Sequence, residues 1–522
     1  MLTRHQIYTL LIVISAGLML GRILAVNRTD SILIQKNRIE QIPKQLADKE
    51  KRLRAAETPI AEDDLQAELE KTKQKLLLDA QFELPVFSAN DRSRWDTLRV
   101  LVEPDMRVQR TVKSPDGTEH TETVWYAIDK AQNTRGWDTI DMVKHDLPDQ
   151  PGEGNQPEGG YLYSSKPPLL PTLMAIPYAL MYWASGGKLS LATEPFLVVR
   201  IVLVVCNLLP LMLCWFLLSK LIERFGTTNW GRVFSVAFVC FGTFISTFAV
   251  TLNNHLPAIV SVTIALYCAV RIVYDQELRW RYYAAAGFFG AFAAACDLPA
   301  LLFCVLIGFW ILCHRFVRTL LLFAPAALLV AAAFFATNYI AHKTFVPAYG
   351  KKYAEDSWYL YKYEREGKIR ESYWGNPSGL DKGEECVGNY IFHSTIGHHG
   401  LFSLTPVWAL SLIGLGIWLF DRRYRSLSAI ILLTSAVVFA FYMLQPLHER
   451  NYGGMTVGLR WLFWLAPLWS VALVAAADKF SRNGFLRAVA LACLIVSAMS
   501  AAYPVWNPWT MPWTYNLLEY VG

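Results

Sequence analysis

Long apolar runs constrain the fold of this chain more than any other feature of its sequence. A helix needs about 20 consecutive, mostly apolar residues to cross a bilayer. Of the 522 residues, 54% have hydrophobic side chains and only 18% are charged. The sequence therefore predicts an all-α polytopic membrane protein with about 11 transmembrane helices. The spans are expected in the apolar runs 7–26, 197–218, 232–250, 256–274, 283–297, 298–313, 319–338, 403–420, 427–444, 458–476 and 485–502.

The sidedness of these spans depends on residues 168–186, an apolar segment with prolines at positions 168, 171 and 177. If this segment crossed the membrane, basic loops such as DQELRWR and DRRYRS would be distributed against the positive-inside rule. If it lies along the outer surface, all the short basic loops fall on the cytoplasmic side. We therefore expect an interfacial helix at 168–186. The run 7–26 follows the basic start MLTRHQ and is interpreted as an uncleaved signal anchor with its N-terminus in the cytoplasm.

With this topology the long polar segments collect on the outer face of the membrane. They are 27–165, 340–402 and 445–456, and the C-terminal stretch rich in Trp and Tyr lies on the same side. We therefore expect an integral protein of a bacterial-type inner membrane with its active site on the outer, periplasmic face. The expected parts are a signal anchor (1–26), an outer helical hairpin (27–84), a catalytic first outer loop with the interfacial helix (85–190), a transmembrane core (191–338), an outer loop (339–402), and the C-terminal transmembrane helices with an outer tail (403–522).

The first outer segment begins with a pattern typical of paired helices. Leucine and isoleucine recur at heptad-like spacing on both sides of the sequence ETPIAEDD. Within it, Thr58 is a candidate helix cap and Pro59 fits the first helical position. The pattern predicts a two-helix hairpin over about 34–78, which we interpret as a spacer or a partner-docking arm.

Two short motifs hold the first candidates for chemistry. In FSANDRSRWDTLRVLVE, Asp91 stands where a helix begins, so it is either a helix cap or a carboxylate that faces a substrate. In YLYSSKPPLL, Lys166 precedes two prolines, which fix the direction of its backbone. A lysine that only anchors a helix at the membrane interface does not need that restriction. We therefore treat Lys166 as a functional candidate.

These motifs, in this order, resemble the glycosyltransferase-C superfamily. The resemblance rests on an acid followed by Arg-Trp at the start of a helix in the first outer loop, and on a Lys-Pro-Pro ahead of an interfacial helix. It is closest to the branch of protein O-mannosyltransferases and lipid A aminoarabinose transferases, and it covers most of the chain after residue 85. It implies the glycosyltransferase-C fold, in which juxtamembrane helices of a long first outer loop lie over the transmembrane helices.

The resemblance also implies a reaction, namely inverting transfer of a sugar from a polyprenyl-phosphate-linked donor to a protein, lipid or glycan acceptor. Asp91 would act as the general base toward the acceptor hydroxyl. The leaving phosphate needs cationic stabilisation, which Lys166 and Arg94 would provide. The chain has neither the GxGxxG loop nor the DxD pair of soluble nucleotide-sugar enzymes, which agrees with a lipid-linked donor.

Two positions depart from the pattern of this family. Arg92 stands where close relatives often have a second acid, and Ser165 stands where the aminoarabinose branch has a glutamate. Both departures argue against carrying over a metal site. A divalent metal is left open, and no metal ligand is predicted.

Further candidates lie at the outer ends of later spans. Asn254 and His255 in TLNNHLPA either contact headgroups and water or bind substrate. His398 and His399 in NYIFHSTIGHHG match no spacing of metal ligands, so we expect them to contact donor or acceptor. Arg460 lies just inside a span, where it either snorkels to the interface or makes a second contact to the donor phosphate.

Three aspartates are weaker candidates. Asp138 and Asp141 in GWDTIDMVKH fit either acceptor contacts or a solvated loop. Asp297 in ACDLPA fits a cap or the lining of an outer turn.

The sequence thus favours a membrane glycosyltransferase whose partners are the polyprenyl-phosphate sugar, its acceptor and membrane lipids. The alternative is a polytopic transporter or flippase, which would need charged residues near the middle of its spans. The sequence has few of these. The net charge of +6 is spread over loops and no CxxC pair occurs among the nine cysteines, which argues against nucleic-acid binding and against a zinc knuckle.

Overall fold

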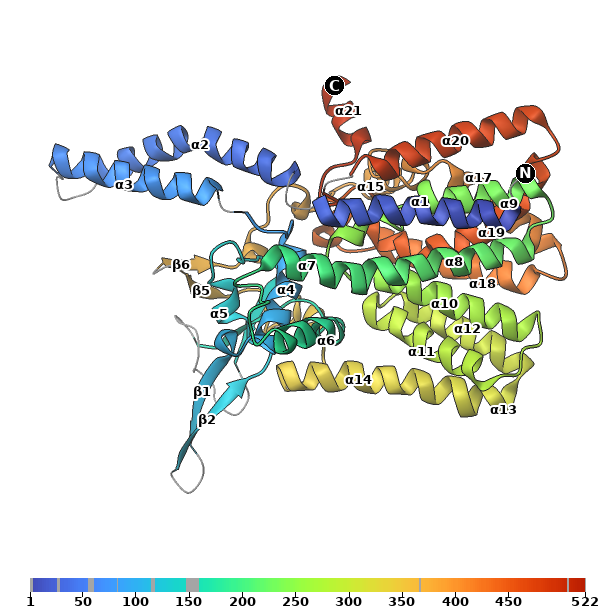
Figure 1. Ribbon diagram of the computed structural model, residues 1–522, viewed down its shortest axis with the longest axis horizontal. Coiled ribbons are helices and arrows are strands. Elements are labelled where there is room, and N and C mark those ends of the chain that lie inside the picture. Colours follow the sequence, from blue (N-terminus) through green and yellow to red (C-terminus); the bar gives the residue numbers. More distant parts are fainter. Residues whose placement is uncertain are drawn as a thin grey trace.

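A bundle of long helices forms most of the molecule, and the polar segments gather at one end of it (Figure 1). The computed structural model describes residues 3–25, 29–54, 61–81, 83–113, 118–146, 159–365, 368–504 and 507–521. The helices of the bundle are α1 (Arg4–Ala25), α7 (Pro195–Leu203), α8 (Leu209–Phe225), α9 (Asn229–Phe241), α10 (His255–Val273), α11 (Trp280–Cys296), α12 (Ala300–His314), α13 (Phe316–Arg318), α14 (Ala324–His342), α17 (Val407–Phe420), α18 (Arg425–Met443), α19 (Ala466–Phe480) and α20 (Gly484–Ala502).

Within the described residues, seven helical segments are long and apolar enough to cross a membrane. The apolar helices α6 (Leu169–Ala184), α12 and α17 are shorter. Helices α9 and α11 account for the remaining predicted spans. The number of about 11 spans therefore stays a prediction. The seven segments are Arg4–Ala25, Pro195–Phe225, His255–Val273, Phe316–His342, Arg425–Met443, Arg460–Phe480 and Gly484–Ala502.

Two of the long segments contain a wide helical turn just before a proline. The π-helical turn η2 (Val204–Leu208) joins α7 to α8, and η4 (Thr319–Phe323) joins α13 to α14. Each following helix has a proline in its first two positions. Because proline donates no backbone hydrogen bond and clashes with the preceding turn, the helix widens there instead of breaking.

The end of the bundle opposite the polar segments brings the short basic loops together. Arg4 donates to Glu223 at 2.9 Å, so the start of α1 lies beside the end of α8. Arg224 donates to Asp275 at 2.8 Å, which joins that end of α8 to the loop after α10. This grouping of loops is the one that the predicted topology requires, and the assignment of this end to the cytoplasm stays a prediction of the positive-inside rule.

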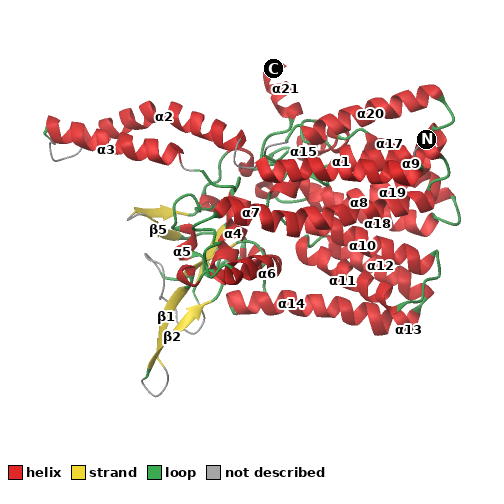
Figure 2. Ribbon diagram, in the orientation of Figure 1, coloured by secondary structure: helices red, strands yellow, loops and turns green. Residues whose placement is uncertain are grey.

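In the described part of the polar segments lie three small antiparallel sheets, each of two strands (Figure 2). The expectation of all-α structure is therefore wrong for the outer loops, although it describes the bundle. Short stretches of alternating polar and β-branched residues such as VQRTVK pair locally once a turn brings them together. The pairs are β1 (Val108–Lys113) with β2 (Glu119–Val124), β3 (Met142–His145) with β4 (Tyr161–Ser164), and β5 (Lys362–Arg365) with β6 (Lys368–Glu371).

Helices α2 (Thr29–Arg54) and α3 (Glu62–Gln81) form the predicted hairpin, which projects from the polar end as an arm (Figure 1). Ile42 and Leu65 are buried in the arm, and Lys49 donates to Glu68 at 2.7 Å across it. The predicted capping residues 58 and 59 lie outside the described residues.

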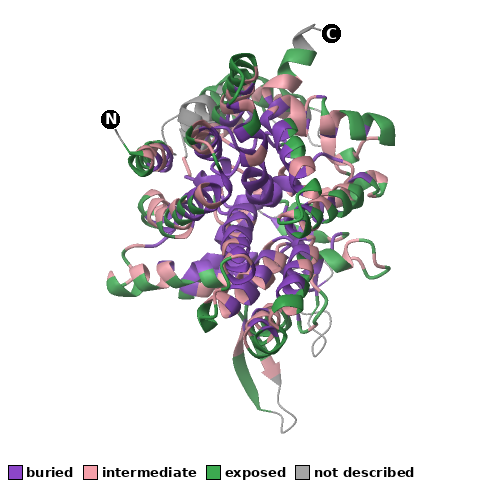
Figure 3. Ribbon diagram, turned by 90° about the vertical axis from the view of Figure 1, so that its right-hand side faces the viewer, coloured by how far each residue is buried: buried purple, intermediate pink, exposed green. Residues whose placement is uncertain are grey.

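The most buried spans form the centre of the bundle. In α10 and in the segment Arg460–Phe480, which contains α19, 83% of an apolar stretch of 18 residues is buried. In the segment Phe316–His342, which contains α14, the corresponding share is 17%. Figure 3, which looks along the bundle, shows this buried centre surrounded by exposed helices. The first residue of α10 is His255, so the start of the central helix faces the polar segments. The remaining described elements of these segments are α4 (Ala89–Val102), η1 (Pro104–Met106), α5 (Asp129–Gln132), η3 (Thr247–Val250), η5 (Ala348–Lys351), η6 (Tyr373–Gly375), η7 (Gly379–Lys382), α15 (Val387–Thr395), α16 (Leu401–Leu404), η8 (Leu447–Glu449), η9 (Arg460–Leu465) and α21 (Trp513–Val521).

Candidate active site

A cavity of about 1090 Å³ lies at the polar end of the molecule, between the polar segment that contains α4 and the adjacent ends of α10, α11, α12 and α18. It unites segments that are far apart in the sequence, and one part of its wall is charged while another is apolar. Its polar and charged lining residues are Ser88, Asn90, Arg92, Arg94, Asp141, Ser165, Lys166, Asn254, His255, Asp297, Lys352, Asp381, Gln445, Glu449, Asn451 and Arg460.

Three of the predicted phosphate-binding cations meet in this cavity. Arg94 comes from α4, Lys166 from the turn before α6, and Arg460 from the first residue of η9. Besides burial, Arg460 lowers the pKa of Arg94, and both arginines lower the pKa of Lys166, since like charges within one cavity repel. Such a cluster persists only with anionic partners, and it is suited to binding a phosphate.

A chain of hydrogen bonds connects two of these cations through an aspartate. Arg94 Nη2 donates to Asn254 Oδ1 at 2.7 Å, and Asn254 Nδ2 donates to Asp297 Oδ1 at 2.7 Å. The other oxygen of Asp297 is 3.1 Å from His255 Nδ1, and His255 Nε2 is 3.1 Å from Arg460 Nη1. The predicted pair Asn254 and His255 therefore holds the arginines in place from the start of the central helix.

Arg460 turns into the cavity and does not extend toward the outer interface. Its Nε donates to the carbonyl oxygen of Gly453 at 2.8 Å. Its guanidinium lies 4.9 Å from the ring centroid of Trp509, a cation–π distance. These contacts fix the side chain beside His255.

Lys166 pairs with Asp141, and this pair forms the opposite side of the charged wall. Lys166 Nζ is 3.1 Å from Asp141 Oδ1. Ser165 N donates to the carbonyl oxygen of Asp141 at 3.0 Å, so the Lys-Pro-Pro turn is tied to the start of β3. The two prolines thus direct Lys166 at a specific carboxylate.

The three cations and Asp141 change each other's proton affinity. Burial lowers the pKa of Arg94 to about 10 although Asp141 opposes this shift. Burial also lowers the pKa of Lys166, against the attraction of Asp141. Burial alone would raise the pKa of Asp141, but Lys166, Arg460 and Arg94 hold it below the ordinary value. Asp141 is therefore ionised at neutral pH.

Asp91 lies behind this wall and is not among the residues that line the cavity. The N-cap of α4 is Ser88, whose hydroxyl oxygen accepts from Asp91 N at 3.2 Å, so Asp91 is in the first turn and is not the cap. Its carboxylate accepts from Leu252 N at 2.8 Å, Trp95 Nε1 at 2.9 Å and Phe87 N at 3.3 Å. Burial raises its pKa to about 7, although these donors act in the opposite direction.

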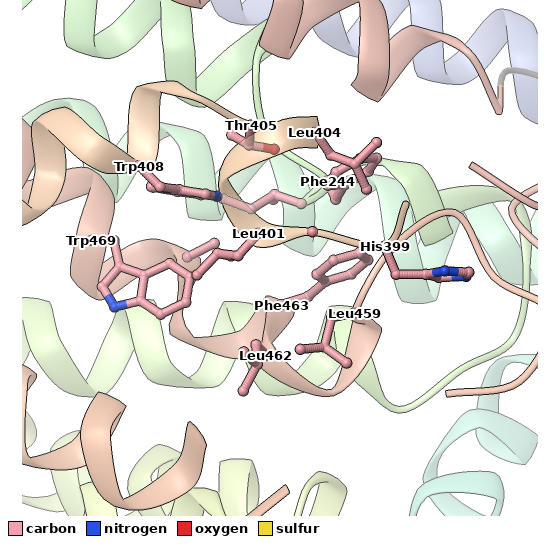
Figure 4. Close-up of a pocket in the computed structure, with 14 residues that line it drawn as sticks. Phe244, His399, Leu401, Leu404, Thr405, Trp408, Leu459, Leu462, Phe463 and Trp469 are labelled. Carbon is pink, nitrogen blue, oxygen red and sulfur yellow. The ribbon is translucent and has the colours of Figure 1, made fainter. Parts of the chain in front are cut away.

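His398 and His399 lie elsewhere, in a cluster with Tyr452. The ring of His399 stacks on Tyr452 with centroids 4.9 Å apart, and neither histidine lines the large cavity. His399 is at the rim of a separate apolar pocket of about 20 Å³ beside Trp408 and Trp469, and its ring points away from these tryptophans (Figure 4). Burial lowers the pKa of His398 to about 4 and that of His399 to about 3.

The apolar part of the cavity wall runs between α12 and α18. Leu301 and Val305 of α12 face Val437 and Phe441 of α18 across it, and all four are also about half exposed on the bundle surface. The groove is therefore accessible from the region where the acyl chains of a bilayer would lie. It leads from there toward the charged wall.

The outer rim of the cavity is aromatic and polar. Trp374 is fixed by a hydrogen bond of 3.0 Å from its indole N–H to the carbonyl oxygen of Ile140. Lys352 lies 4.8 Å from the ring centroid of Trp374 and donates to Glu449 at 2.6 Å. This rim comes from the 340–402 and 445–456 segments, and its residues Lys352, Trp374 and Glu449 were not among the candidates that the sequence indicated.

The sequence indicated Asp297 and Asp141 only as weaker candidates and did not predict their partners. The signal for Asp297 was present, because a lone acid in the short break between two apolar runs is costly unless it is paired. No pattern in the sequence indicates that Asp141 pairs with Lys166, because only the folding of the chain brings β3 and the Lys-Pro-Pro turn together. Within the described ranges, no group of three or more His, Cys, Asp or Glu side chains is arranged to hold a metal ion.

Comparisons with known proteins give one structural likeness. No protein-family model matches the chain, and no curated protein matches it. Among solved structures, it is similar to the crystal structure of the Archaeoglobus fulgidus oligosaccharyltransferase in complex with Zn and sulfate, with a TM-score of 0.36 and 12% sequence identity. The match covers 69% of this chain and 47% of the archaeal chain, so this chain corresponds to less than half of that protein. No family membership follows from a likeness of this size.

Proposed function

We propose that the protein is an integral-membrane glycosyltransferase that moves a sugar from a polyprenyl-phosphate-linked donor to an acceptor on the outer face of the membrane. The acceptor classes that fit are proteins, lipids and glycans. The proposed fold family is the glycosyltransferase-C superfamily, on the motifs around Asp91 and Lys166.

One observation carries this proposal: a single cavity joins a cluster of three cations to an apolar groove that reaches the bundle surface. A polyprenyl-phosphate sugar has the matching parts, namely an isoprenoid chain, a phosphate and a sugar. The chain would lie between α12 and α18, and the phosphate would be held by Arg94, Lys166 and Arg460. The sugar would then extend toward the aromatic rim that contains Trp374.

In the proposed reaction the acceptor oxygen attacks the anomeric carbon and the polyprenyl phosphate leaves. The three cations stabilise the negative charge that develops on the leaving phosphate. The acceptor needs a general base, for which the sequence predicts Asp91. The hydrogen bonds that Asp91 accepts from Phe87, Trp95 and Leu252 would have to rearrange before it could act as that base.

A transporter or flippase is less well supported by the charge distribution. The central helix α10 carries no charged residue between His255 at its outer end and Arg271 near its other end. The charged residues of the cavity lie at the outer ends of spans and do not continue through the bundle. A path for an anionic headgroup would require them further along.

Transfer activity of the purified protein in lipid nanodiscs tests the proposal. A panel of undecaprenyl-phosphate sugars with radiolabelled sugars would be offered with membrane extracts as acceptors. We expect transfer with release of undecaprenyl phosphate, and a loss of about 10- to 100-fold in Lys166→Ala, because a charge-assisted contact to phosphate is worth about 1.5–3 kcal/mol. Lys188→Ala, which removes an exposed lysine just after α6, is the matched control.

Two results would contradict the proposal. One is transfer that Lys166→Ala leaves at the wild-type rate. The other is movement of the intact donor across the bilayer without cleavage of its sugar, which would make the protein a flippase.

A further inference from the structure

We propose that Asp141 takes the proton of the acceptor, and that Lys166 leaves Asp141 for the donor phosphate before this step. This inference rests on the proposed transferase function and assigns its general base. It differs from the motif-based choice of Asp91.

Four acids line the cavity among the described residues, and two of them have both carboxylate oxygens occupied. Asp297 is held by the side chains at the start of α10, as described above. Asp381 accepts from Asn451 Nδ2 at 2.8 Å on one oxygen and from the hydroxyl of Tyr373 at 3.0 Å on the other. A carboxylate held in this way has no free oxygen for the acceptor.

Glu449 has one oxygen that accepts no hydrogen bond from the described residues, but it is not a main electrostatic partner of the cation cluster. Its Oε1 accepts from Lys352 and from the hydroxyl of Tyr353, both at 2.6 Å. The strongest electrostatic partners of Arg94, Lys166 and Arg460 do not include Glu449.

Asp141 combines the two properties that the base needs. It is a strong electrostatic partner of Arg94, Lys166 and Arg460. Its Oδ1 is paired with Lys166 at 3.1 Å, whereas its Oδ2 accepts no hydrogen bond from any described residue. The side chain is 12% exposed, and this exposure is toward the cavity that it lines.

The backbone around Asp141 is fixed on both sides, so the carboxylate has a defined position. Its N–H donates to Thr139 Oγ1 at 3.1 Å, and its carbonyl oxygen accepts from Ser165 N at 3.0 Å. Thr139 Oγ1 in turn donates to the carbonyl oxygen of Ala89 at 2.7 Å, which ties the loop to the start of α4. A base held in this way needs no rearrangement of α4, in contrast to Asp91.

The proposed step conserves atoms and charge. The acceptor O–H transfers its proton to Asp141 Oδ2 while its oxygen forms a bond to the anomeric carbon. The bond between that carbon and the phosphate oxygen breaks, and its electron pair leaves with the polyprenyl phosphate. Asp141 then returns the proton to solvent through the open cavity.

Because Lys166 pairs with Asp141, the strength of Asp141 as a base depends on whether the donor is bound. Paired with Asp141, the ammonium group of Lys166 neutralises the carboxylate and weakens it as a base. A donor phosphate in the cation cluster competes for the same ammonium protons and places negative charge near the carboxylate. Asp141 therefore becomes a stronger base only after the donor has bound, and we expect the donor to bind before the acceptor.

The test compares Asp141→Asn and Asp141→Glu with Asp91→Asn, and uses Asp138→Asn as the matched control. Asp138 lies in the same loop but does not line the cavity, and it pairs with Arg365 at 2.9 Å. Each protein in nanodiscs is assayed for binding of undecaprenyl phosphate, for transfer from the productive donor, and for the pH dependence of transfer. Binding alone reports the donor site, so a failure of the proposed function shows as absent binding and transfer in the wild type.

If the inference holds, Asp141→Asn binds undecaprenyl phosphate at least as tightly as the wild type, because Lys166 is free for the phosphate. Its transfer falls by about 100-fold or more, the usual range for a lost general base. The acid limb of the wild-type pH profile disappears in this variant, Asp141→Glu regains part of the rate, and Asp138→Asn changes neither binding nor transfer. The inference is overturned if Asp141→Asn transfers within about threefold of the wild type. It is also overturned if Asp91→Asn, with an unchanged melting temperature, abolishes the acid limb instead.

Discussion

Arg460 Nη1 lies 3.1 Å from His255 Nε2, and this contact defines the protonation of the histidine. A guanidinium only donates, so Nε2 accepts and the single ring proton of a neutral imidazole is on Nδ1. That proton points at Asp297 Oδ2, 3.1 Å away. His255 therefore acts as a neutral connector that positions Arg460, and its basic nitrogen is not available to a substrate.

This arrangement predicts different effects for two substitutions of His255. His255→Gln places an amide oxygen near the position of Nε2, so it still accepts from Arg460, and binding of undecaprenyl phosphate should weaken by less than about threefold. His255→Ala leaves both Arg460 and Asp297 without this partner, which costs about 1–2 kcal/mol, or about 10-fold in affinity. Titration of nanodisc samples with undecaprenyl phosphate measures both. Equal losses in the two variants would show that Arg460 does not depend on the acceptor nitrogen.

A second prediction concerns acid stability at the junction between β3 and the end of α14. His145 Nδ1 donates to the carbonyl oxygen of Asp146 at 2.9 Å, and its Nε2 is 3.0 Å from His342 Nδ1. The ring stacks between Tyr163 and Trp358, with centroid distances of 4.5 and 4.0 Å. Burial lowers the pKa of His145 from 6.5 to about 4.

Because the folded pKa of His145 is depressed, the unfolded chain binds more protons between pH 6.5 and about 4. The contribution of neutral His145 to the free energy of unfolding is complete above pH 6.5. It decreases toward pH 4 with a slope of up to about 1.4 kcal/mol per pH unit. His145→Phe keeps the stacking and should reduce the slope measured by thermal or denaturant unfolding between pH 7 and 4 by this contribution, while His398 and His399, whose pKa values burial also lowers, keep theirs. His448→Gln, a substitution outside the junction between β3 and α14, should leave the dependence of the free energy of unfolding on pH unchanged.

A third prediction tests the close approach of two spans. A Cβ at Gly414 of α17 would overlap the carbonyl oxygen of Ala472 of α19, whereas a Cβ at Gly416 would meet nothing within 4 Å. Gly414→Ala must therefore push the helices apart, at a cost of about 1–3 kcal/mol in the free energy of unfolding. Gly416→Ala on the same helix should be neutral or slightly stabilising, since alanine favours the helix. Melting temperatures of the two variants in detergent measure the difference, and equal values would contradict the observed packing.

The sequence was informative where local chemistry determines structure, and less so where distant segments meet. The short basic loops and the long polar segments lie at opposite ends of the bundle, as the predicted topology requires, because charge bias and apolar length are local properties. Lys166 and Arg460 were candidates for their unusual positions in the sequence and Arg94 through the family resemblance, and the fold brings the three together. The direction of Asp91 could not be predicted, because it depends on Leu252, which reaches its carboxylate from the loop before α10.

A last prediction addresses the apolar groove between α12 and α18. Leu302 of α12 lines the cavity, whereas Leu306, one turn further along the same helix, does not, and both are partly exposed. Leu302→Trp should fill the groove and weaken binding of undecaprenyl phosphate by about 10-fold, since a displaced isoprenoid chain loses its packing against the groove. Farnesyl phosphate, whose short chain occupies less of the groove, should be affected much less. Leu306→Trp adds the same side chain outside the cavity and should bind both lipids like the wild type. If both tryptophan variants weaken the two lipids equally, the chain does not lie between α12 and α18, and the phosphate cluster must be reached by another route.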